Sequence, residues 1–240
     1  MLTRIPVPVF TLLIVIGTAA AIGAHYLGSP WVHWIAKPAT TLLCAAMALS
    51  LPVTDAGYRR WVVIGLLLST VGDVFLMLPG DWFLHGLIGF LLAHLAYLVA
   101  FGQRERFLAR AAPFAAYAIV AVGILAWLWP GIPGAMRIPV VVYVVALGSM
   151  AAQAAAIWRV RRDRVTALAA AGGMLFMASD SMIAIGRFGE PFDGQRLAVL
   201  TTYWAAQWLI ARSVSARLVC NSPAVRAQRV PRVLATNCRR

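Results

Sequence analysis

Apolar residues run along almost the whole chain in stretches of about twenty, separated by short segments rich in turn-forming residues. A helix of this length matches the thickness of the hydrocarbon core of a bilayer. The breaks carry glycine, proline and aspartate, as in Pro79-Gly80-Asp81. The pattern predicts an all-α polytopic membrane protein in which residues 1–219 form eight transmembrane helices. The predicted spans are 6–27, 32–52, 60–79, 83–102, 111–129, 136–158, 165–187 and 197–218.

Composition agrees with a membrane protein and leaves no room for a soluble domain between the stretches. Of the 240 residues, 62% are hydrophobic and 12% are charged, whereas soluble domains carry about 25% charged residues. The first stretch lacks a convincing cleavage site, so we expect a retained helix instead of a secretion signal. Cys44, Cys220 and Cys238 form no CxxC pair and predict neither a metal site nor a disulfide framework.

Basic residues gather on one side of the predicted membrane. Seventeen of the 21 Lys and Arg residues fall on the side of the two termini, and four (Lys37, Arg137, Arg187 and Arg196) fall on the other. The positive-inside rule then places both termini in the cytoplasm, and the short loops favour a bacterial inner membrane. We expect residues 220–240 to form a flexible basic tail on anionic headgroups. The net charge of +13 is thereby explained without a nucleic-acid partner.

Two aspartates lie deep inside apolar stretches, each in a similar setting. Asp73 stands in Gly72-Asp73-Val74-Phe75-Leu76, and Asp180 in Ser179-Asp180-Ser181-Met182-Ile183. A carboxylate at membrane depth costs several kcal/mol, on the order of 3, unless a partner or a watery cavity receives it. The pair therefore predicts a functional site. The similar placement of the two aspartates also raises the hypothesis of a parallel repeat of four plus four helices.

Other polar residues in the spans fall close to the depth of the aspartates. Counted from the outer ends of their helices, Lys37, Asp73 and Asp180 all lie about 10 Å deep, at 1.5 Å per residue. Tyr203 and Gln207 share one helix face, while His94 and Tyr97 lie nearer the midplane. We predict a polar cup in the outer half of the membrane. The competing interpretation is structural, with an ion pair to Lys37 or hydrogen bonds that hold helices together.

Several residues with possible chemistry are given lesser roles. Ser181 has neither a GxSxG elbow nor an adjacent base, so we predict a helper and not a nucleophile. His25, His33 and His85 fall near an aromatic belt of tryptophans and are expected to be interfacial anchors. The sequence contains no HExxH or similar spacing, and we predict no metal and no cofactor.

Three elements of the sequence resemble signatures of the YhhN-like membrane proteins, the family that includes animal lysoplasmalogenases. The first element runs from Gly72 through Leu78 and continues to His94 and Tyr97. The second runs from Phe176 to Ser181 and continues to Tyr203 and Gln207, and Lys37-Pro38 fits a lysine-proline element. The resemblance covers roughly residues 30–212. It implies an eight-helix membrane enzyme that cleaves the vinyl ether bond of a lysophospholipid and places the acid/base carboxylates at Asp73 and Asp180. The substrate-binding set would be Lys37, His94, Tyr97, Ser181, Tyr203 and Gln207.

Two carboxyl groups suit this chemistry. Vinyl ether cleavage needs an acid that protonates carbon and a base that directs water. Burial and charge pairing can give two carboxyl groups different pKa values, so that one acts as the acid and the other as the base. The sequence leaves open which aspartate is which. It also leaves two other classes open: a proton-coupled transporter, for which intramembrane carboxylates would be equally natural, and a non-catalytic lipid-binding or membrane-stabilising protein.

Overall fold

The computed structural model describes residues 5–215, with the exception of the side chain of His25, and every regular element in that range is helical. The predicted tail at 220–240 lies outside these residues. Eight α-helices coincide closely with the eight apolar stretches, although the last helix ends at Arg212 and its predicted span reaches 218. The helices are α1 (Val7–Tyr26), α2 (Pro30–Ser50), α3 (Ala56–Met77), α4 (Phe83–Gly102), α5 (Ala111–Leu128), α6 (Gly134–Arg161), α7 (Arg164–Phe188) and α8 (Gln195–Arg212), with a single 3-10 turn, η1 (Trp129–Gly131), between α5 and α6.

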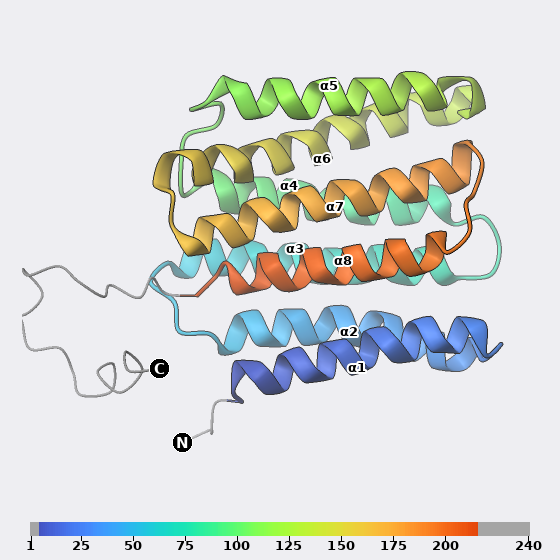
Figure 1. Ribbon diagram of the computed structural model, residues 1–240, viewed down its shortest axis with the longest axis horizontal. Coiled ribbons are helices and arrows are strands. Elements are labelled where there is room, and N and C mark those ends of the chain that lie inside the picture. The colour runs from blue at the N-terminus through green and yellow to red at the C-terminus, as the bar shows by residue number, and fades with distance from the viewer. Residues whose placement is uncertain (1–4, 216–240) are drawn as a thin grey trace, which may run out of the picture.

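The helices lie side by side, and successive helices run in opposite directions (Figure 1). In that view α1 and α2 lie at one edge of the bundle and α5 and α6 at the other, with α3, α4, α7 and α8 between them. We call the end where α1 begins and α8 ends the basic end, because Arg104, Arg159 and Arg161 lie there. The opposite end is called the vestibule end, after the cavity described below. The tightest neighbours are α3 with α4 and α7 with α8.

Side-chain caps fix the beginnings of two helices at the basic end. Asp55 precedes α3, and its carboxylate accepts a 2.9 Å hydrogen bond from the backbone N–H of Tyr58. Asp163 precedes α7 and accepts a 2.8 Å bond from the N–H of Thr166. Such caps satisfy backbone donors that the first turn of a helix leaves open. They set the register of the two helices that carry the intramembrane aspartates.

Glycines allow α3 and α4 to approach closely beside Asp73. A Cβ atom on Gly89 would lie 2.8 Å from the backbone nitrogen of Gly72 and 2.9 Å from its Cα. A Cβ on Gly72 would in turn meet the ring of Phe90 at 2.6 Å. Contacts this short are not tolerated by packed atoms, so only glycine fits at these positions. Small residues at helix crossings are typical of helices that pack within lipid.

Seven of the helices, α1 to α7, are long and apolar enough to cross a membrane. The eighth, α8, has 18 residues and packs along α7, α2 and α1, but its hydropathy is lower. The difference arises mainly from Gln195 and Arg196 at its start, Arg212 at its end and Gln207 within it. The architecture is therefore that of a polytopic helical membrane protein.

Candidate active site

Asp73 on α3 is held by donors from two other helices. Its side chain is 1% exposed. Nζ of Lys37 on α2 lies 3.3 Å from Oδ1, and the hydroxyl groups of Thr41 on α2 and Tyr203 on α8 each donate a 2.7 Å hydrogen bond to Oδ2. Thr41 in turn accepts a 3.2 Å bond from the indole N–H of Trp204. One cation and two hydroxyl donors offset part of the cost of burying a charge on this carboxyl group.

The polar network continues from Tyr203 to α4. The amide nitrogen of Gln207 donates to the hydroxyl of Tyr203 at 3.2 Å, and the amide oxygen accepts from the hydroxyl of Tyr97 at 2.7 Å. Gln207 and Tyr203 lie one turn apart on the same face of α8, as their spacing predicts. Lys37, Tyr97, Tyr203 and Gln207 are thereby brought together with Asp73, in one chain that links α2, α3, α4 and α8.

Asp180 on α7 has a separate and less polar environment. Its Oδ2 accepts a hydrogen bond from the hydroxyl of Tyr143 on α6. Nε2 of His94 on α4 lies 3.7 Å from the same oxygen, which is too long for a hydrogen bond. His94 is fully buried, and among the described residues neither of its ring nitrogens has a hydrogen-bond partner. Asp180 thus has one neutral donor where Asp73 has a cation and two donors.

Aromatic rings fill the space between the two carboxyl groups. The ring of Phe176 on α7 lies 4.7 Å from that of His94 and 5.6 Å from that of Tyr203, in edge-to-face contacts. Phe90 on α4 packs against both Phe176 and Tyr203. Phe176 thereby contacts one neighbour of each aspartate, Tyr203 beside Asp73 and His94 beside Asp180. The aspartates therefore occupy adjoining environments, and the single polar cup expected from the sequence is divided by these rings.

A cavity lined by both polar and apolar side chains opens at the vestibule end, and we call it the vestibule. It encloses about 1930 Å³ of empty space, including its open mouth. Its walls come from the α1–α2 and α7–α8 connections and from the ends of α3 and α4. Lys37, Arg187, Asp193, Gln195 and Arg196 contribute polar groups to it. Three of these five residues are cationic and one is acidic, although Lys37 and Arg187 also pair with Asp73 and Asp81. The excess of basic side chains in the wall suits an anionic group.

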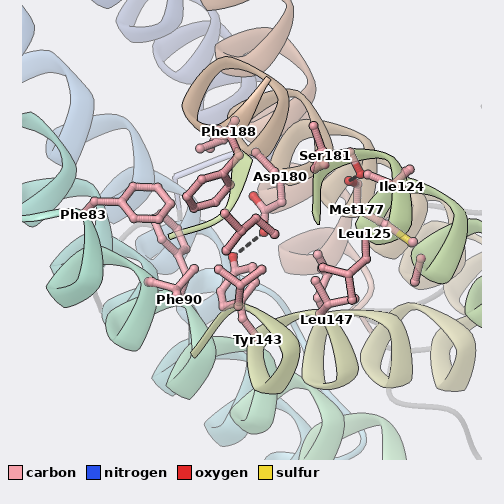
Figure 2. A pocket seen from close by; sticks show the side chains of 18 of the residues that line it. Phe83, Phe90, Ile124, Leu125, Tyr143, Leu147, Met177, Asp180, Ser181 and Phe188 are labelled. Atoms are coloured by element: carbon pink, nitrogen blue, oxygen red, sulfur yellow. Dashed lines mark hydrogen bonds between the residues drawn. The ribbon is translucent and has the colours of Figure 1, made fainter. Parts of the chain in front are cut away.

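An apolar pocket lies beside the vestibule, mainly among α4, α5, α6 and α7, and its empty space is about 800 Å³ including the part that is open to the outside (Figure 2). Its polar side chains are those of Asp180, Tyr143 and Ser181. The other lining residues are aliphatic or aromatic, with one methionine, Met177. In Figure 2 the carboxyl group of Asp180 and the hydroxyl of Tyr143 meet at the wall of the pocket. Leu76, Phe83 and Ile183 line both the pocket and the vestibule. The two cavities are therefore neighbours, and Asp180 is the carboxyl group that reaches the pocket.

The other residues singled out in the sequence have the following positions. Ser181 lines the pocket, and its hydroxyl donates to the carbonyl of Met177 at 2.7 Å. His85 packs against Phe75 and Trp82 near the vestibule end, and Nδ1 of His33 lies 2.9 Å from the carbonyl of Ala21. Asp73 lines neither cavity. Within residues 5–215, no three His, Cys, Asp or Glu side chains are placed to hold a metal ion.

Sequence reasoning missed Thr41, Tyr143 and Phe176. Thr41 carried a signal, because it follows Lys37 by four residues and so lies on the same face of α2. Tyr143 is a lone phenol in the aliphatic run Val140 to Leu147, and such an interruption also deserved inspection. Phe176 begins the second element that resembles the family, but a phenylalanine in an apolar helix gives no indication of which residues it contacts.

The chain is similar to known proteins over most of its length. Residues 32–214 match the model of the YhhN family. A lysoplasmalogenase of Mycobacterium bovis is 36% identical over 195 residues, covering 78% of this chain and 72% of that protein. The lysoplasmalogenase TMEM86A of Bos taurus is 35% identical over 182 residues, 72% of each chain. A membrane protein named YhhN of Escherichia coli O6:H1 is 26% identical over 195 residues, 81% of this chain and 92% of that protein. No solved structure gives a significant match.

Proposed function

This chain belongs to the YhhN family, and from that membership we propose that it is a membrane-embedded hydrolase of lysoplasmalogen-like lysolipids. It would cleave the vinyl ether bond and release a fatty aldehyde and a glycerophospho-base. The observation that carries the proposal is the position of Asp180. Its carboxyl group stands in the wall of an apolar pocket that adjoins a cationic vestibule. A lipid with its headgroup in the vestibule would bring the bond next to its chain close to this acid.

The vestibule supplies the chemistry for a phosphate headgroup. Lys37 lies in its wall, and its ammonium group also pairs with Asp73. Arg187 and Arg196 line the same cavity. Guanidinium and ammonium groups are the usual partners of phosphate oxygens in proteins. The glycerol that joins headgroup and chain would then cross the boundary formed by Leu76, Phe83 and Ile183.

Asp180 is assigned as the general acid. In its protonated form it donates a proton to the β-carbon of the vinyl ether. The π electrons form the new C–H bond, and a lone pair of the ether oxygen stabilises the positive charge at the α-carbon. An apolar environment with a single neutral hydrogen-bond donor favours the neutral form of a carboxyl group. Asp180 meets that condition, whereas Asp73 lies against a cation.

The same carboxyl group can complete the hydrolysis. Water adds to the α-carbon and gives a proton to the carboxylate of Asp180, which restores the acid and leaves a hemiacetal. The hemiacetal then breaks its bond to the glycerol oxygen, and its hydroxyl proton passes to that oxygen. Aldehyde and alcohol are released, and all protons are accounted for. Retaining glycosidases use a carboxyl group as acid and then as base in a similar way.

Asp73 has a different part in this proposal. It lines neither cavity, and its carboxylate, held by Lys37, Thr41 and Tyr203, would supply a fixed negative charge near the pocket. A preorganised charge of this kind stabilises an oxocarbenium ion without moving. The network of Tyr203, Gln207 and Tyr97 holds Asp73 in place. His94, whose ring nitrogens have no hydrogen-bond partner among the described residues, is close enough to Asp180 to help hold the attacking water.

The topology predicted from the sequence is part of the proposal. We take α8 as the eighth span, because it lies along α7 within the bundle and its polar side chains bond to neighbouring helices. An even number of spans places both termini on one side, which the arginine bias assigns to the cytoplasm, in a bacterial inner membrane. The α3–α4 and α7–α8 pairs support the four-plus-four repeat, since each pair packs tightly and each carries one aspartate.

The decisive experiment follows aldehyde and fatty acid released from alkenyl and acyl lysolipids by purified full-length protein in detergent. Wild type should release aldehyde from the alkenyl lipid. Asp180→Asn should lose at least about 100-fold, the lower range for general acid catalysis, while the exposed-loop control Glu190→Gln keeps full turnover. A folded Asp180→Asn protein with wild-type turnover would refute the assignment. Absence of aldehyde in detergent, with solute uptake in sealed vesicles, would instead favour the proton-coupled transporter.

A further inference from the structure

The apolar pocket is built from matching faces of three helices. On α5, α6 and α7 the lining residues recur at i, i+3, i+4 and i+7, over 121–128, 140–147 and 177–184. This spacing marks one continuous face of a helix. Seven residues advance about 10 Å along a helix axis. The pocket is therefore a channel that follows the helix axes, with Asp180 and Tyr143 part of the way along its wall.

The two ends of the channel differ. Toward the vestibule end it meets Phe83 and Ile183, which also line the vestibule. In the other direction it reaches Ala121 on α5 and Leu147 on α6, which lie farther from the vestibule than Asp180 does. Ala121 and Leu147 are 8% and 5% exposed. A path from the vestibule past Asp180 thus ends among buried apolar side chains.

A single hydrocarbon chain is the occupant that fits this path. The channel is lined almost wholly by apolar side chains, and Asp180 and Tyr143 stand in its wall between its two ends. Burying an aliphatic chain in such a channel stabilises the complex by about 25 cal/mol for each Å² of apolar surface removed from water. A headgroup cannot enter it without losing its solvation.

We propose that the channel holds the alkenyl chain of the substrate and that Ala121 sets the chain length which the enzyme accepts. The inference rests on the proposed function and adds a specificity determinant to it. Ala121 is the smallest of the four α5 residues in the lining, beside Ile124, Leu125 and Leu128. A large side chain at this position would fill the end of the channel and shorten the space beyond Asp180.

The test compares full-length wild type, Ala121→Val and Ala121→Phe on lysoplasmalogens with butenyl, hexenyl and decenyl chains, because the channel beyond Asp180 is only a few carbons long. Ile119→Phe is the matched control, since Ile119 is on the same helix but 73% exposed and outside the lining. Aldehyde release gives kcat/KM for each chain. Binding of saturated alkyl ether lysolipids, which the reaction cannot cleave, is followed by the shift in Tm.

Ala121→Phe should lower the decenyl-to-butenyl ratio of kcat/KM by at least about tenfold, the range for a misfitting methylene group in an apolar pocket. Ala121→Val should show a smaller change in the same direction, and the Tm shifts should follow the same order. Ile119→Phe should keep the wild-type ratio. If wild type releases aldehyde but the folded Ala121 variants keep its ratio and its Tm shifts, the chain-length inference is wrong. If wild type releases no aldehyde, the proposed function itself is wrong, and the chain-length inference is wrong with it.

Discussion

The hydroxyl of Tyr203 donates a 2.7 Å hydrogen bond to Oδ2 of Asp73, while Lys37 lies 3.3 Å from Oδ1 of the same carboxyl group. Asp73 is thus held from both sides, by α8 and by α2. Because the ion pair is buried, its two charges depend on each other far more than an exposed pair would.

Removal of the Lys37 charge alone should therefore lower the free energy of unfolding more than removal of both the Lys37 and the Asp73 charges. Lys37→Met leaves a buried carboxylate without its cation, and we expect the free energy of unfolding to fall by about 3–5 kcal/mol. Lys37→Met combined with Asp73→Asn should recover much of that loss. Equilibrium unfolding in mixed micelles measures both variants. A double variant that is no more stable than Lys37→Met would show that the pair contributes no charge compensation.

Tyr143→Phe tests whether the phenol positions Asp180. The change removes the hydrogen bond to Oδ2 and keeps the ring that packs against His94. We expect kcat to fall by up to about 100-fold, within the range of acid catalysis itself, with a much smaller change in KM. The alkaline limb of the pH–rate profile, where the acid loses its proton, should also move. Tyr117→Phe, on α5 and outside both cavities, serves as the control. A lower kcat with an unmoved limb would indicate a purely structural role.

Asp81 gives the fold a pH dependence at the vestibule end. Nη2 of Arg187 donates a 2.6 Å hydrogen bond to this carboxylate and lowers the pKa of Asp81, with a further contribution from the N–H of Phe83. Since the folded pKa is below the unfolded one, the stabilisation is present above the ordinary aspartate pKa of about 3.9 and is lost as the pH falls through the folded pKa. The Tm difference between wild type and Asp81→Asn should shrink between neutral and strongly acidic pH. High salt should weaken it at neutral pH. A constant difference would contradict the assignment.

Gly89 and Gly123 make a matched pair for the helix contact beside the site. Gly89→Ala would drive a methyl group into the backbone of Gly72, and we expect a loss of about 1–3 kcal/mol, typical of overpacking. Gly123 has nothing within 4 Å of the added atom, so Gly123→Ala should be neutral or stabilising by up to about 1 kcal/mol. Equal losses in both variants would show that the contact between α3 and α4 is not the cause.

The helices, the family and part of the site could be predicted from the sequence. The resemblance to the YhhN-like proteins is confirmed. Lys37 was placed near Asp73 from helix depth alone, and Tyr203 and Gln207 were assigned to one face by their spacing. Depth and spacing are properties of a single helix, and both can be read from a chain that crosses a membrane in straight segments.

The partners across helices were harder to predict. Asp180 meets Tyr143 because α6 and α7 are rotated so that these residues face each other, and rotation depends on how all neighbouring side chains pack. The division of the polar cup by Phe90 and Phe176 has the same origin. Both phenylalanines lie in elements that resemble the family, but nothing in the local sequence shows that their rings would contact each other and Tyr203.

The polar character of α8 has a consequence for biosynthesis. Tyr203, Trp204 and Gln207 bond to residues on α2, α3 and α4, which emerge from the ribosome long before them. As the last of the eight helices to be made, α8 is also the one that bare lipid would accept least readily. Its insertion should therefore depend on earlier helices that have already packed together. A mutation in any of its hydrogen-bond partners on these helices would leave α8 poorly inserted and expose it to cellular quality control.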